Sequence, residues 1–411
     1  MAAAFYPPKP SSSLIRLVQI MAPPVACLFF KMRLRISAAD LATLRSLQHQ
    51  RVILLCNHPS FNDPVAVMLL SAKLHKGYYY LTSVEQFDGP LGWIFQRIGS
   101  YSVRRGLSDR QSLKQTQRLL RQADTHLVVF PEGGCSFQNE TVMPFRPGAI
   151  QIALQTLVHQ VRQGQAPPDC YVVPLALKYE YSTPLGPVID TLLGRLEAEL
   201  GLERNLDHDP YQRLRTLAIA VLEQVEADYG LPSPPPSRDL TPRIETLRQE
   251  ILRQCEQSLQ IQTNPQALVR ERTYQIEFAL RKMTESANAP DGQGPEASLP
   301  AALIEKSIQR LLNFNAIYDG YVAESPTPER FLDTLTRFER EVFSIDRPKI
   351  KGFRWAHLRV GAPVNLRDWL QAYEAGRSQT VETLSEGLRQ QVQSMLTPAA
   401  PQTSAPLRLK P

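Results

Sequence analysis

The sequence of 411 residues lacks the short motifs that mark metal sites and serine nucleophiles. Its five cysteines form no C-x-x-C pair, which argues against a disulfide framework or a zinc site and favours reduced thiols in a protein that faces the cytosol. The seven histidines form no H-E-x-x-H motif, and no G-x-S-x-G elbow is present. We therefore expect no metal and no resident cofactor.

Long apolar runs are also scarce. Residues 14–30 (LIRLVQIMAPPVACLFF) are apolar but interrupted by Arg16, Gln19 and the pair Pro23-Pro24. Because a membrane-spanning helix needs about 20 mostly apolar residues, this run is too short and too broken to cross a bilayer. The basic residues Lys31, Arg33 and Arg35 follow this run. We expect residues 1–35 to insert into one leaflet of a membrane, with these cations at anionic headgroups. The alternative is a core helix of a globular domain.

The composition is that of a globular protein, with 43% hydrophobic and 21% charged residues. A net charge of +6 favours anionic partners, such as lipid headgroups, nucleic acid or phosphorylated substrates. The basic stripe on a helix expected at residues 108–122 has no interleaved aromatic residues, so we expect no nucleic-acid partner. A solvated helix face also explains this stripe, and contact with a membrane surface is the other interpretation.

Strands alternate with helices from residue 32 to residue 177, which predicts an α/β fold with a mostly parallel sheet flanked by helices. An apolar strand at residues 52–56 ends in the polar loop Asn57-His58-Pro59-Ser60-Phe61-Asn62-Asp63, and a helix follows with Pro64 in its first turn. A carboxylate that holds one imidazole nitrogen leaves the other free to take a proton, so His58 and Asp63 are candidates for acid–base chemistry. Alternatively, Asp63 is only a helix cap and His58 an ordinary loop histidine.

Further polar groups follow later strands. Arg105 ends a short strand, and the loop Pro131-Glu132-Gly133-Gly134 follows an apolar strand at residues 127–130. The glycines allow backbone N–H groups to approach a ligand closely. Arg146 precedes a helix whose amino terminus can bind an anion.

The order and spacing of these segments closely resemble the glycerolipid (PlsC-like) acyltransferase family, of the glycerol-3-phosphate or 1-acylglycerol-3-phosphate acyltransferase type. The four matching blocks are residues 57–63 (NHxxxxD), residues 99–105 (ending in arginine), residues 130–133 (FPEG) and residues 173–175 (a strand with proline). The resemblance implies transfer of a fatty acyl group from acyl-CoA or acyl carrier protein to a hydroxyl of a glycerolipid precursor, in phospholipid biosynthesis at the cytoplasmic face of a membrane. It implies His58 and Asp63 as catalytic residues, and it places these residues around the acceptor: Ser60, Arg105, Glu132, Gly133, Gly134 and Arg146.

The third block departs from the family pattern. Gly134-Cys135-Ser136 stands where the family usually has Thr-Arg-Ser, so an arginine is missing. FPEGG occurs in a branch that resembles glycerol-3-phosphate acyltransferases, so the departure bears on the acceptor rather than on acyl transfer. Arg104 or Arg146 could supply the missing charge, or the acceptor is a lipid alcohol without phosphate. A further alternative is a non-catalytic module that binds lipid or acyl carrier.

Residues 358–364 (LRVGAPV) resemble the closing strand and G-x-P turn of the same domain. This resemblance implies a catalytic domain at residues 36–182, a helical insertion at residues 183–350, a return to the catalytic domain at residues 351–397 and a disordered tail at residues 398–411. The alternative is an independent helical domain at the carboxyl terminus.

Overall fold

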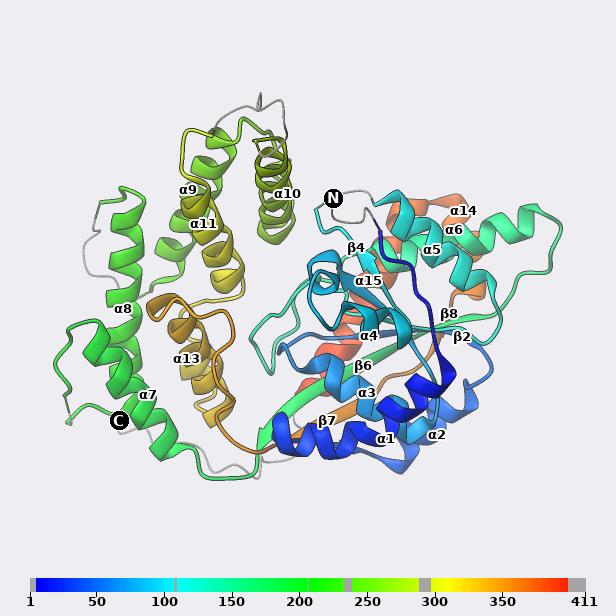
Figure 1. Cartoon of the computed structure of the whole chain (residues 1–411), viewed down its shortest axis with the longest axis horizontal. Helices are drawn as coiled ribbons and strands as arrows, with labels where there is room; N and C mark the ends of the chain where they lie inside the picture. The colour runs from blue at the N-terminus through cyan, green and yellow to red at the C-terminus, as the bar shows by residue number, and fades with distance from the viewer. Residues whose placement is uncertain (1–4, 107–108, 206, 233–238, 288–296, 398–411) are drawn as a thin grey trace. The chain divides into compact units, whose positions relative to one another are not determined.

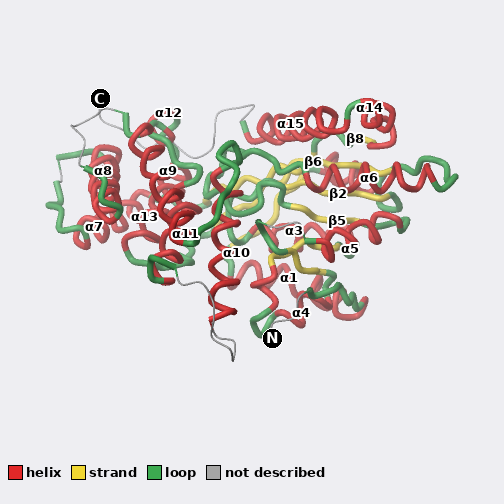
Figure 2. The backbone as a smooth tube through the Cα atoms, turned by 90° about the horizontal axis from the view of Figure 1, so that it is seen from above, coloured by secondary structure: helices red, strands yellow, loops and turns green. Residues whose placement is uncertain are grey.

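The computed structural model describes residues 5–106, 109–205, 207–232, 239–287 and 297–397. The chain forms two compact units. Among the described residues, the first comprises residues 5–104, 109–183 and 352–397, and the second comprises residues 105–106 and the described part of 184–351. All the strands in the described residues belong to the first unit, whereas the described part of the second contains helices and loops (Figure 2). The disordered tail expected at residues 398–411 lies outside the described residues.

An eight-stranded sheet forms the centre of the first unit (Figure 1). Its order is β1-β7-β6-β2-β5-β3-β4, and β8 pairs with β6. Only the pairs β6–β7 and β6–β8 are antiparallel, so the prediction of a mostly parallel sheet in an α/β fold is confirmed. The strands are β1 (Met32–Ile36), β2 (Arg51–Cys56), β3 (Tyr79–Ser83), β4 (Ser100–Val103), β5 (His126–Val129), β6 (Cys170–Tyr181), β7 (Arg354–Val360) and β8 (Val364–Asn365).

Two apolar clusters cover the two faces of this sheet. One gathers side chains from α5, α6 and α15, and the other from α2 and α3. Strands β2 and β5 are buried on both faces, which explains why they read as continuous apolar runs rather than as alternating patterns. The helices of this unit are α1 (Ser12–Phe29), α2 (Ala38–Ser46), α3 (Asp63–Leu74), α4 (Gly92–Arg97), α5 (Arg110–Arg121), α6 (Gly148–Arg162), α14 (Leu370–Ala375) and α15 (Arg377–Leu396).

Strand β6 occupies the middle of the sheet and is longer than its neighbour β2. The two run in parallel until Cys56 lies opposite Leu175, and β6 then continues to Tyr181 beside the loop that follows β2. On its other side β6 pairs with β7, although these strands are separated in the sequence by the helical region (Figure 1). The far half of β6 therefore flanks the loop that carries His58.

Helix α1 continues through Pro23 and Pro24 without a break. Proline adopts helical φ, and here the packing of Ala22 and Ala26 against Leu69 of α3 outweighs the backbone hydrogen bonds that the prolines remove. In the described part of the chain, α1 is the one helix long and apolar enough to cross a membrane by length and composition alone. Most of α1 is not buried, unlike a core helix.

The second unit contains α7 (Gly186–Glu199), α8 (Pro210–Asp228), α9 (Thr241–Ser258), α10 (Val269–Ala287), α11 (Ala301–Phe314), α12 (Tyr321–Glu324) and α13 (Pro328–Val342). Buried arginines pair with carboxylates between its helices. Arg213 donates to both oxygens of Glu197 at 2.7 and 2.6 Å, and Arg310 donates to Glu341 at 2.8 Å and to Asp228 at 2.6 Å. These pairs explain how a region rich in Arg and Glu forms a packed unit.

Candidate active site

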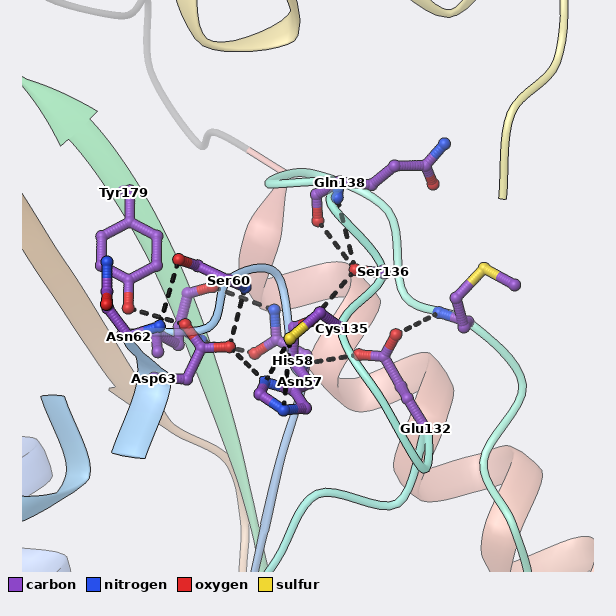
Figure 3. Close-up of polar contacts among 12 residues, drawn as sticks. Asn57, His58, Ser60, Asn62, Asp63, Glu132, Cys135, Ser136, Gln138 and Tyr179 are labelled. Carbon is purple, nitrogen blue, oxygen red and sulfur yellow. Dashed lines mark hydrogen bonds and ion pairs between the residues drawn. The ribbon is translucent and has the colours of Figure 1, made fainter. Parts of the chain in front are cut away.

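His58 and Asp63 form a direct pair in the loop between β2 and α3 (Figure 3). His58 Nδ1 lies 2.6 Å from Asp63 Oδ2. The Asp63 side chain is fully buried, whereas 15% of the His58 side chain is exposed. Because Asp63 occupies Nδ1, the other ring nitrogen, Nε2, is the one available for proton transfer.

Asp63 is not the cap of α3. Asn62 occupies the N-cap position, and its side chain makes no capping hydrogen bond. The Asp63 carboxylate instead accepts the Ser60 N–H at 2.9 Å and the Tyr179 hydroxyl at 2.6 Å. Burial and the Asp63 charge raise the pKa of Tyr179 well above its usual value, so the hydroxyl stays protonated and donates. Tyr179 and Ser60 thus hold the carboxylate in place toward His58.

The ionisation of His58 reflects opposing effects. Burial lowers the pKa of His58, but the Cys135 sulfur and the Asp63 carboxylate raise it more. The pKa consequently lies well above the usual value near 6.5. Phe130 stacks against the imidazole with ring centroids 4.4 Å apart, which fixes the plane of the ring.

Hydrogen bonds to the backbone of His58 attach the loop after β5 to the loop after β2. The carboxylate of buried Glu132 accepts the His58 N–H at 2.7 Å and the Met143 N–H at 3.3 Å. The Ser136 N–H donates to the His58 carbonyl oxygen at 2.7 Å. Glu132, predicted to bind substrate, therefore uses both carboxylate oxygens to position the two loops (Figure 3).

Gly133 and Arg146 lie against each other. Gly133 has a φ of +76°, and a Cβ added there would be 2.8 Å from Arg146 Cδ. Only glycine combines this backbone conformation with room for the arginine. The fold thus brings the predicted binding residues Glu132, Gly133, Gly134 and Arg146 to one loop beside His58.

Arg105 belongs to the second unit and contacts helix α10 there. Its guanidinium lies 4.5 Å from the centroid of the Tyr274 ring, and its Nη2 lies 3.5 Å from Glu277 Oε1. Both partners are in α10. The role of Arg105 in binding an acceptor stays a prediction.

Two asparagines extend the pairing of β6 beyond the end of β2. Asn57 donates to the Leu177 carbonyl oxygen at 2.9 Å and accepts the Leu177 N–H at 2.7 Å. Asn139 makes the same pair of bonds with the backbone of Tyr179, both at 2.6 Å. Each side-chain amide therefore replaces a neighbouring strand by pairing with both backbone groups of one residue of β6. Together the two asparagines attach the loops after β2 and β5 to the strand that carries Tyr179.

We expect Asn139→Ala to lower the free energy of unfolding by about 2–6 kcal/mol, because each of two buried backbone groups left without a partner costs about 1–3 kcal/mol. Chemical denaturation measures the global effect, and hydrogen exchange at the Tyr179 amide reports the local one. An unchanged unfolding midpoint together with unchanged exchange at Tyr179 would contradict this role.

The comparisons with known proteins agree with this geometry. Residues 39–178 match the model of a family described as Acyltransferase. In a comparison with curated proteins no similar sequence was found. The matched range includes the His58–Asp63 loop and the Glu132–Gly133 loop, whereas Tyr179 and β7 follow it in the sequence. Residues 39–178 are therefore similar to this family, which supports the predicted resemblance over this part of the chain.

Proposed function

We propose that this protein transfers a fatty acyl group from acyl-CoA or acyl carrier protein to a hydroxyl of a glycerolipid precursor, either glycerol-3-phosphate or 1-acylglycerol-3-phosphate. The observation that carries the proposal is the His58–Asp63 pair, 2.6 Å apart at the carboxyl end of β2 in an acyltransferase domain. No resident cofactor or metal takes part, since the acyl thioester is itself an activated substrate.

The chemistry requires a base. A hydroxyl has a pKa far above neutrality, so its attack on a thioester carbonyl needs a group that removes its proton as the new C–O bond forms. His58 Nε2 accepts this proton, and Asp63 stabilises the resulting imidazolium through Nδ1. When the C–S bond breaks, the departing thiolate takes the proton from Nε2, and the imidazole is neutral again.

Two arginines are proposed to bind a phosphate on the acceptor. Arg146 lies against Gly133 in the loop that is attached to His58, and Arg105 is the arginine that matches the family's second block. A guanidinium can bind two phosphate oxygens at once. A lipid alcohol without phosphate is the alternative acceptor.

The protein is also proposed to act at the cytoplasmic face of a membrane. Helix α1 exposes large apolar side chains that are 48–73% accessible to solvent: Leu17, Ile20, Met21, Leu28 and Phe29. The basic residues of β1 follow this helix directly in the sequence. Apolar side chains next to cations suit an interface with anionic lipids.

An acceptor panel tests this function. Purified protein is given palmitoyl-CoA or palmitoyl acyl carrier protein with glycerol-3-phosphate, 1-acylglycerol-3-phosphate or a long-chain alcohol, with and without anionic vesicles. Ester formed with one of the two phosphorylated acceptors supports the proposal. Ester formed with the alcohol alone overturns the proposed acceptor, and binding of lipid without any ester indicates a binding module.

The raised pKa of His58 gives a prediction for pH dependence. A protonated imidazole cannot act as a base, so kcat/KM should fall as the pH is lowered through that pKa, with the midpoint of the acid limb above 6.5. The imidazolium–Asp63 pair stabilises the fold below the pKa of an unfolded histidine, and this stabilisation is lost as the pH rises through the folded value. Initial rates across about pH 5–9 measure the limb. A midpoint below 6.5 would be inconsistent with this electrostatic environment.

A further inference from the structure

Helix α5 presents a row of exposed cations on one face. The row consists of the four basic residues of the helix, which lie at i, i+4, i+8 and i+11 and are all exposed: Arg110, Lys114, Arg118 and Arg121. The remaining exposed residue of α5 is Gln111, so no exposed side chain of this helix is apolar. We call the surface formed by the four cations the basic face of α5.

Neighbouring carboxylates do not balance these charges. Helix α5 contains no Asp or Glu, and within the described residues none of the four cations forms an ion pair. On other helices an exposed arginine pairs with a glutamate one turn away, as Arg253 does with Glu250 and Arg389 with Glu386. Like charges four residues apart destabilise a helix, and α5 has two such pairs. This arrangement attracts a partner of opposite charge.

The position of α5 separates this partner from a membrane bound at α1. Leu119 and Leu120 of α5 belong to the apolar cluster on one face of the sheet. Helix α1 packs on Leu69 of α3, which covers the other face, and Figure 1 shows α5 and α1 on opposite sides of the sheet. A flat membrane that receives the apolar side chains of α1 therefore does not also lie against the basic face. The basic face suits an acidic soluble partner.

The basic face begins at the edge of the sheet where His58 lies. Strands β2, β5, β3 and β4 are parallel, so their carboxyl ends share this edge. Helix α5 follows β4 and runs back from the edge, which places Arg110 nearest to it and Arg121 farthest away. Strand β4 is three strands from β2, a distance of about 14 Å at the usual spacing of neighbouring strands. A protein bound on the basic face therefore lies beside the candidate active site.

We propose that the basic face of α5 docks acyl carrier protein, one of the two donors of the proposed reaction. The proposal rests on the acyl transfer proposed above and gives it a protein partner. Acyl carrier proteins are small, acidic, helical proteins that hold the acyl thioester on a flexible phosphopantetheine arm. Charge attraction positions the carrier on α5, and the arm spans the distance to His58. CoA ends in the same phosphopantetheine thioester and reaches His58 without this surface.

Charge reversal tests the docking surface. Arg110→Glu combined with Arg118→Glu, the reversed variant, alternates the charges along the face and removes both repulsive pairs, so we expect α5 to fold. The matched control is Arg45→Glu combined with Lys73→Glu, which makes the same change in net charge at exposed positions of α2 and α3 on the opposite face of the sheet. Circular dichroism verifies that both variants are folded.

Three readouts are taken with the full-length protein. Fluorescence anisotropy measures binding of labelled holo-acyl carrier protein, which needs neither an acyl group nor an acceptor. Initial rates of ester formation are measured on the acceptor panel with palmitoyl acyl carrier protein and with palmitoyl-CoA. Sedimentation with anionic vesicles measures membrane binding of the same proteins.

The proposal predicts that the reversed variant binds the carrier about tenfold more weakly than wild type, or weaker still. Its kcat/KM with palmitoyl acyl carrier protein should fall to a similar extent. Its rate with palmitoyl-CoA and its vesicle binding should equal those of wild type, and the control variant should match wild type in every readout. Carrier binding by wild type should weaken as the salt concentration rises.

The remaining outcomes separate this proposal from the proposed function. Ester from palmitoyl-CoA without carrier binding, or carrier binding undiminished in the reversed variant, overturns the docking surface and leaves acyl transfer intact. Loss of vesicle binding in the reversed variant with carrier binding unchanged also overturns it and assigns the basic face to a membrane. Carrier binding that the reversed variant loses, without ester from any acceptor in wild type, supports the docking surface and overturns the proposed acceptors. Absence of both carrier binding and ester in wild type overturns both proposals.

Discussion

His58→Ala is expected to lower kcat/KM for acyl transfer by about 10³–10⁴-fold, the upper part of the range for loss of a general base. The imidazole is the group that takes the acceptor's proton. Alanine removes this base and leaves Asp63 buried without its partner. Initial rates at saturating donor and varied acceptor measure the effect.

His159→Ala is the matched control, because His159 is an exposed histidine on α6 of the same unit. It should retain the wild-type rate, which separates loss of the base from a general effect of removing a histidine. A His58→Ala protein that is folded and retains a rate within a few-fold of wild type would exclude His58 as the base.

Asp63→Asn is expected to give the second largest effect, a loss of about 10²–10⁴-fold in kcat. An amide keeps the volume of the side chain but removes the charge that stabilises the imidazolium, and it can hold His58 in the wrong tautomer. The acid limb of the pH profile should also move to lower pH, because Asp63 is one of the groups that raise the pKa of His58. A change in folding alone would lower the amount of active enzyme without moving this limb.

Tyr179→Phe distinguishes positioning from charge. Phenylalanine removes only the hydroxyl that donates to Asp63 at 2.6 Å, so the His58–Asp63 pair remains. We expect a loss of about tenfold, which corresponds to about 1.4 kcal/mol for one hydrogen bond to a charged group. If Tyr179→Phe were as damaging as Asp63→Asn, the hydroxyl would have a role beyond holding the carboxylate.

The sequence was informative where a contact is local. His58 and Asp63 are five residues apart in one loop, and a strand followed by Pro64 places them at the carboxyl end of the sheet. The apolar runs at β2 and β5 likewise predict buried parallel strands. Both strands end at the same edge of the sheet, and the hydrogen bond from Ser136 to His58 joins the loops that follow them.

The contacts missed in the sequence join distant segments. Tyr179 lies 116 residues from Asp63, and Cys135 lies 77 residues from His58. Predicting the Tyr179 contact requires knowing that β6 is adjacent to β2 and extends beyond it, and predicting the Cys135 contact requires knowing that β5 is adjacent to β2. No local pattern encodes either pairing. Asn57 and Asn139 read as ordinary loop residues for the same reason, although they complete the edge of β6.

At two places tertiary contacts override a local tendency of the sequence. Asp63 has the residue type and position of a helix cap, but its carboxylate instead bonds Tyr179, Ser60 and His58. Pro23 and Pro24 would end an isolated helix, but packing against α3 keeps α1 continuous. In both places the deciding contact is with a residue distant in the sequence, Tyr179 for Asp63 and Leu69 for α1.

The most direct test of the central claim is the stoichiometry of one reaction. Purified protein is mixed with palmitoyl-CoA and glycerol-3-phosphate, and released CoA and the new ester are quantified together by mass spectrometry. The account predicts one ester for each CoA released, with both products lost in His58→Ala and retained in His159→Ala. Release of CoA together with free fatty acid and without ester, or ester formation undiminished in His58→Ala, would contradict it.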